Sequence, residues 1–200
     1  MDYTLQIAFF IFIILGAIVH EYCHGWMADQ LGDPTARDQG RLTLNPLAHI
    51  DPMGSLLLPA FAWWATNGRF LFAYAKPVPF NPDNLRYQKW GPALVGVAGP
   101  AANIVLALML GAVIRLFGYS EITSFLAVGV EANVVLAVFN LVPIPPLDGS
   151  KILFSFFPDS WRHIQAALDR YGFILFFVFI FSFSHLLSPL MDFLYRIIVY

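Results

Sequence analysis

Residues 20–24, His-Glu-Tyr-Cys-His, combine two histidines and a glutamate at a spacing that suits metal chemistry. Residues four apart lie on one face of a helix, so the imidazoles of His20 and His24 can bind one metal ion. Glu21 can then act as a base on a water molecule at that metal. The pattern predicts a metal centre on a helix, with hydrolysis as its chemistry.

The composition places this helix in a membrane protein. Of the 200 residues, 58% are hydrophobic and 12% are charged, about half the charged share of a soluble domain. The net charge is −2, so no basic face exists for nucleic acid, and we expect no nucleic-acid partner. The single cysteine excludes an intrachain disulfide.

Three apolar runs, residues 5–27, 93–117 and 122–141, are long enough to cross a bilayer as helices. The tail, residues 171–200, contains Ser188-Pro189 and reads either as one kinked span or as a span plus an interfacial helix. Residues 54–65 are too short to span, and residues 70–82 hold three prolines, which favours extended backbone. We predict an all-α polytopic membrane protein with one domain over residues 1–200: three core spans, C-terminal span(s) and a re-entrant or extended segment at about 54–82.

The positive residues predict an orientation. If the 54–82 segment enters and leaves on one side, three loops share a side and hold seven of the 11 Lys and Arg residues. The positive-inside rule places those loops in the cytoplasm and the N-terminus outside. His20 then lies inside the membrane, near the cytoplasmic side, and we expect the cell membrane as the location. Two idle histidines beside a carboxylate are the alternative, but such groups are costly in a bilayer.

Catalytic zinc usually has three protein ligands, so a third donor is needed. Asp148 is our candidate, because the prolines at 143, 145 and 146 end the third span and can turn the chain back towards His24. Glu131 ranks second, and Cys23 is more typical of a buried apolar side chain. We assign no chemistry to the remaining histidines and expect them at surface or interfacial positions; they are His49, His163 and His185.

Two asparagines could assist at the site. Asn140, in the last turn of its span, could donate to an oxyanion or position substrate, and Asn103 could do so from the neighbouring helix. Hydrogen bonding between helices is the alternative for both residues.

The sequence resembles the site-2 protease family of intramembrane zinc metalloproteases, in its short form without a PDZ domain. The matching pieces are H-E-Y-C-H at 20–24, G-P-A-A-N at 99–103 and F-N-L-V-P-I-P-P-L-D-G at 139–149, together with residues 40–59 and 75–81. The resemblance implies that His20, His24 and Asp148 bind zinc, that Glu21 is the general base and that Asn140 assists at the substrate carbonyl. It also implies a catalytic core of residues 5–27, 93–117 and 122–148.

These observations predict a zinc endopeptidase, with one zinc ion per chain, that cleaves a transmembrane helix of a membrane protein substrate. We expect the extended residues 76–82 to pair with an unwound substrate by strand addition. The rival interpretation is a membrane metal-binding protein or metal transporter without proteolysis. Glu21 discriminates the two, because only a protease needs it for turnover. The sequence carries no signal of oligomeric state.

Overall fold

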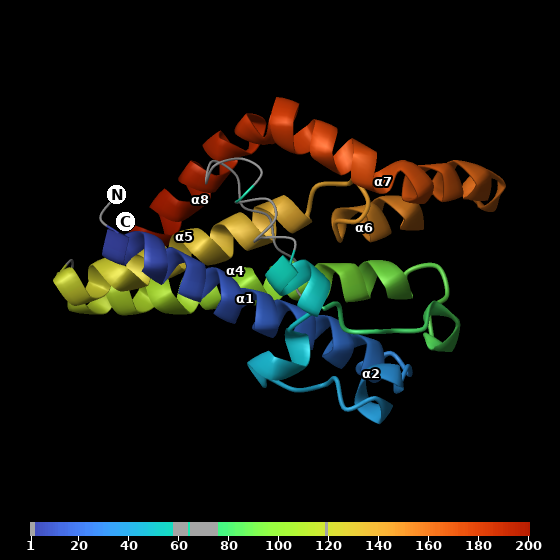
Figure 1. Cartoon of the computed structure of the whole chain (residues 1–200), viewed down its shortest axis with the longest axis horizontal. Coiled ribbons are helices and arrows are strands. Elements are labelled where there is room, and N and C mark those ends of the chain that lie inside the picture. The colour runs from blue at the N-terminus through green and yellow to red at the C-terminus, as the bar shows by residue number, and fades with distance from the viewer. Residues whose placement is uncertain (1–2, 58–63, 65–75, 119) are drawn as a thin grey trace.

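The computed structural model describes residues 3–57, 64, 76–118 and 120–200, and this part of the chain contains helices and no β-strand. Three long helices pack on one another at its centre (Figure 1): α1 (Tyr3–Gln30), α4 (Gly91–Phe117) and α5 (Glu121–Asn140). They confirm the three predicted core spans, with each end within three residues of its expected position. The all-helical fold class is thereby confirmed.

Local chemistry sets the boundary between α4 and α5. Helix α4 ends at Gly118, whose φ of 75° is readily adopted by glycine. Helix α5 begins with a capping box in which Ser120 and Thr123 each accept a hydrogen bond from the backbone N–H of the other. The short connection makes the two helices antiparallel neighbours.

The C-terminal region forms an arch over these helices (Figure 1). Helix α7 (Arg162–Phe183) follows a short turn, η4 (Asp159–Trp161). The helix starts earlier than residue 171, where the sequence predicted the beginning of the C-terminal span. A single 3₁₀ turn, η5 (Ser184–Leu187), joins α7 to α8 (Ser188–Val199). Helix α8 packs on α4 and α5 through Ile198 and Val199, whereas α7 meets the C-terminal end of α5, where Phe176 and Phe179 lie against Phe139. The break falls just before Pro189, as its missing N–H leads one to expect.

The apolar surface is that of an integral membrane protein. Four helical stretches of the described chain are long and apolar enough to cross a bilayer: α1, α4, α5 and the arch over Asp159–Val199. Large apolar side chains such as Ile7, Phe10 and Ile14 are exposed along α1. In water this exposure would be unfavourable, whereas lipid chains can cover it.

Short elements connect the spans: α2 (Thr35–Asp38), η1 (Pro46–His49), η2 (Pro52–Leu57), η3 (Pro82–Asn84) and α6 (Gly149–Ser155). Of the expected re-entrant segment, residues 54–57 belong to η2, a short π-helical turn, and most of the rest lies outside the described residues. Residues 76–81 are non-helical, as the prolines predict, while residues 70–75 lie outside the described part.

Candidate metal centre

The two histidines of α1 meet Asp148, although 124 residues separate His24 from that aspartate. His20 and His24 are 5% and 6% exposed, and their ring centroids lie 4.5 Å apart. Oδ2 of Asp148 lies 2.9 Å from Nε2 of His20 and 3.0 Å from Nε2 of His24. The structure therefore brings together all three residues that the sequence suggested as metal ligands.

The turn after α5 delivers Asp148 to this point. The chain leaves α5 at Asn140, passes through the proline-rich residues 143–146 and starts α6 directly after Asp148. Gly149 makes the reversal possible, because a Cβ at this position would lie only 2.2 Å from the carbonyl oxygen of Leu141. The expectation that the prolines turn the chain back towards α1 is confirmed.

Space and donor chemistry at this point fit zinc. Two imidazole nitrogens and one carboxylate oxygen form a typical catalytic zinc set, and a fourth position is left for water or substrate. Tetrahedral bonds of zinc to such atoms place neighbouring ligand atoms about 3.4 Å apart, within about 0.5 Å of the observed distances. Gly99 of α4 keeps the space open: a Cβ there would lie 2.6 Å from Nε2 of both rings.

Hydrogen bonds on the far side of each ring fix its tautomer. Nδ1 of His24 lies 2.7 Å from the carbonyl oxygen of Val95, which can only accept, so Nδ1 carries a proton. Nδ1 of His20 lies 2.7 Å from Oδ1 of Asn103. In both rings Nε2 is consequently the nitrogen available to a metal.

Asn133 and two backbone carbonyl groups determine which way the Asn103 amide faces. Nδ2 of Asn103 donates to the carbonyl oxygen of Gly16 at 3.1 Å and to Oδ1 of Asn133 at 2.9 Å. Nδ2 of Asn133 in turn donates to the carbonyl oxygen of Gly129. Because backbone carbonyls only accept, both amides have one allowed orientation, which directs Oδ1 of Asn103 towards His20. The helix-to-helix interpretation of Asn103 therefore holds, and Asn133 was missed from the sequence.

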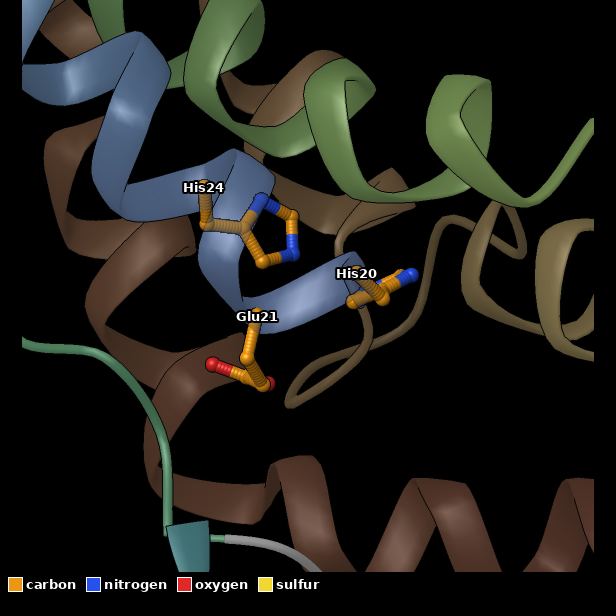
Figure 2. A group of neighbouring side chains, drawn as sticks. All are labelled: His20, Glu21 and His24. Carbon is orange, nitrogen blue, oxygen red and sulfur yellow. The ribbon is translucent and has the colours of Figure 1, made fainter. Parts of the chain in front are cut away.

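The Glu21 carboxylate lies beside the imidazole rings of His20 and His24. Figure 2 shows Glu21, His20 and His24 on one stretch of α1, and ligand atoms of the three lie within 4.8 Å of one another. Oε2 of Glu21 accepts a hydrogen bond of 2.8 Å from the backbone N–H of Val78. A glutamate this close to the ligands, without itself being needed as one, suits a base.

A cavity opens onto these groups. Its walls include Glu21 and Asp148 as well as Asn140, whose Nδ2 donates to the carbonyl oxygen of Leu136 within its own helix. Lys151 also lines it: Nζ donates to Oδ1 of Asp148 at 2.7 Å, leaving Oδ2 for the two rings. The sequence analysis missed Lys151, although its position three residues after Asp148 on a helix was a usable signal.

The rival ligands lie elsewhere or are engaged otherwise. Glu131 of α5 lies close enough to Asp192 of α8 to interact electrostatically with it, and it does not line the cavity at His20, His24 and Asp148. Cys23 is half-buried. His163 and His185 are exposed, as expected. The expectation for His49 is wrong: it is 3% exposed, and its Nε2 lies 2.8 Å from the carbonyl oxygen of Thr43.

Residues 76–82 have few free backbone N–H groups for the expected strand addition. Its prolines at 77, 79 and 82 have no N–H. The N–H groups of Lys76, Val78 and Asn81 already donate to His49, Glu21 and Asp33 respectively. A substrate strand would therefore find few free donors here.

Fold and site together define an integral membrane protein with a buried cluster of histidine and carboxylate side chains of the kind that binds a metal in metallohydrolases. Comparison with known proteins agrees: the sequence model of "Peptidase family M50" matches residues 117–183. "Putative zinc metalloprotease YwhC" of Bacillus subtilis is 34% identical over 176 residues, which cover 83% of this chain and 76% of that protein. The chain belongs to peptidase family M50, the site-2 protease family.

Other relatives carry similar names. "Putative zinc metalloprotease Rip2" of Mycolicibacterium smegmatis is 32% identical over 178 residues, which cover 83% of this chain and 65% of that protein. "Putative zinc metalloprotease MJ0611" of Methanocaldococcus jannaschii is 31% identical over 86 residues, 42% of this chain and 44% of that protein. No solved structure matches the chain.

Proposed function

We propose that this protein is an intramembrane zinc endopeptidase that hydrolyses peptide bonds in transmembrane segments of membrane protein substrates. The observation that carries the proposal is the meeting of His20, His24 and Asp148 beside Glu21, in a cavity formed between apolar helices. One ligand set supports one zinc ion per chain.

The proposed roles follow from the contacts of each residue. When bound, zinc polarises the substrate carbonyl and lowers the pKa of water. Glu21 accepts the proton of the attacking water at its second oxygen, since Oε2 is held by Val78, and passes it to the amine of the leaving peptide. Asn140, in the cavity wall, would donate to the carbonyl oxygen as negative charge develops there.

The location of the site supports an orientation. The ligands lie towards the C-terminal ends of α1 and α5. These two ends share a side because α1 and α5 both run antiparallel to α4 (Figure 1). The positive residues of the neighbouring loops favour the cytoplasm for this side. We therefore propose the cell membrane as the location, with the site near its cytoplasmic face and a transmembrane helix as substrate.

The Glu21→Gln variant tests the function. Wild type and variant are reconstituted in phosphatidylethanolamine and phosphatidylglycerol vesicles with a single-span reporter whose transmembrane segment contains Leu, Gly and Asn. Zinc is measured by mass spectrometry, and His20→Ala serves as the variant expected to lose the metal. Cleavage by wild type, with zinc retained but cleavage lost in Glu21→Gln, supports the protease. Equal activity of wild type and Glu21→Gln would refute the proposed base and favour a metal carrier.

A further inference from the structure

Residues 76–80, which we call the strap, run past Glu21 as extended chain. Pro77 and Pro79 fix their own φ angles and restrict the preceding residues, Lys76 and Val78, to extended conformations. Since prolines lack an N–H, Val78 carries the single backbone donor of residues 77–79. That donor is directed at Oε2 of Glu21.

The Val78 side chain packs against α1 at Gly25. Val78 is 5% exposed, and its side chain packs where Gly25 leaves room, since a Cβ at Gly25 would lie 2.7 Å from Cγ1 of Val78. Gly25 and Glu21 are four residues apart and so share a face of α1. The side chain and the amide of Val78 thus engage neighbouring positions on the face that carries Glu21.

The upstream end of the strap is tied down without Glu21. The N–H of Lys76 donates to the carbonyl oxygen of His49 at 2.9 Å. Nη2 of Arg41 donates to the carbonyl oxygens of Lys76 and Pro77, at 3.0 and 3.3 Å. These bonds hold the two residues that precede Val78.

The downstream end is fixed at a buried carboxylate. Asp33 is fully buried and accepts hydrogen bonds from the N–H of Asn81 and from Nδ2 of Asn84, as well as from Thr35. Burial raises the pKa of the Asp33 carboxyl, but these hydrogen bonds outweigh that effect and hold its pKa below the usual value. Phe80 adds a contact to Lys151, the residue that donates to Asp148: the Phe80 ring centroid lies 5.6 Å from Nζ of Lys151.

We propose that the strap is a positioning element for the base, in which the Val78 amide holds one oxygen of Glu21 so that the other faces the cavity. The strap is fixed by bonds on both sides of Val78, whereas the Glu21 side chain has three torsions that can change between rotamers. The strap therefore fixes the position of the Glu21 side chain, and Glu21 does not fix the position of the strap. The inference rests on the proposed function and extends it to a residue 57 positions away.

The full-length protein in vesicles tests this with two substitutions at one position. Val78→Pro removes the N–H but keeps extended backbone, whereas Val78→Ala keeps the N–H and removes only packing. We expect Val78→Pro to lower kcat about tenfold or more relative to Val78→Ala, with similar KM and unchanged zinc content. Equal kcat for the two variants would overturn the proposal, and so would faster cleavage by Val78→Pro, which would identify the strap as a gate.

Hydrogen exchange provides a measurement that is independent of cleavage. Because Pro77 and Pro79 have no amide hydrogen, a peptide covering residues 77–80 reports essentially on Val78 and Phe80. We expect slow exchange in wild type and in Glu21→Gln, which keeps an acceptor oxygen, and faster exchange in Glu21→Ala. Unchanged exchange in Glu21→Ala would overturn the strap contact. Absence of cleavage by zinc-loaded wild type, in contrast, would overturn the proposed protease function while leaving this contact in place.

Discussion

Replacing Asn103 by leucine should weaken zinc binding without unfolding the protein. Leucine has the same number and branching of side-chain heavy atoms as asparagine, although it is larger, and it accepts no hydrogen bond from Nδ1 of His20. Asn103 is fully buried, so water cannot take its place. The His20 ring would then keep an unpaired N–H whenever Nε2 faces the metal, and it could relax only by turning away.

The size of the effect follows from the bond that is lost. A buried donor left without an acceptor costs about 1–3 kcal/mol. Since 1.4 kcal/mol corresponds to a factor of about ten, we expect zinc affinity to fall about 10- to 100-fold, in line with other changes behind a metal ligand. Asn133→Ala, which removes only the group that orients Asn103, should cost less, about threefold.

Competition with a chromogenic zinc chelator in detergent measures these affinities directly. Asn103→Asp keeps an acceptor oxygen and should bind zinc more tightly than Asn103→Leu. Leu108→Ala serves as a control, because Leu108 lies on the same helix with its side chain exposed. Zinc affinity of Asn103→Leu equal to that of wild type would refute the view that this asparagine fixes the His20 tautomer.

Two further outcomes are expected. Gly99→Ala should abolish zinc binding, because the new Cβ would lie 2.6 Å from Nε2 of both histidines. Helix α4 should persist, because alanine is a better helix former than glycine. Measurements of metal content and circular dichroism check these two outcomes. Asp33 should stabilise the fold above the ordinary aspartate pKa of about 3.9, and this stabilisation should be lost as the pH falls through its lower folded-state pKa. Thermal unfolding in detergent should therefore become less pH-dependent below about pH 4 in Asp33→Asn, and equal pH dependence in both proteins would contradict this role.

The long apolar runs were readable from the sequence because a bilayer imposes length and composition on any helix that crosses it. The His-Glu-Tyr-Cys-His pattern was readable for a similar reason, since helical geometry alone places residues 20 and 24 on one face. Asp148 was inferred from prolines, which restrict the backbone locally. In each case the governing constraint acts within a few residues along the chain.

The break in the C-terminal helix was only half determined. Pro189 marks where a helix can begin, but the start of α7 at Arg162 and the packing of α8 on α4 and α5 depend on partners elsewhere. The burial of His49 was missed for the same reason, because a loop conformation places the carbonyl oxygen of Thr43 beside its ring.

The sequence by itself determined the helices and the placement of His20 and His24 on one helix face, because these follow from local geometry and from the solvent that the chain must face. Only the tertiary structure decided which groups from other elements hydrogen-bond to His20 and to Glu21. The Asn133 to Asn103 to His20 series crosses from α5 through α4 to α1, and the Val78 amide reaches Glu21 over 57 residues. Such contacts have no period in the sequence, since a hydrogen bond between helices depends on how they are rotated and how deeply they pack.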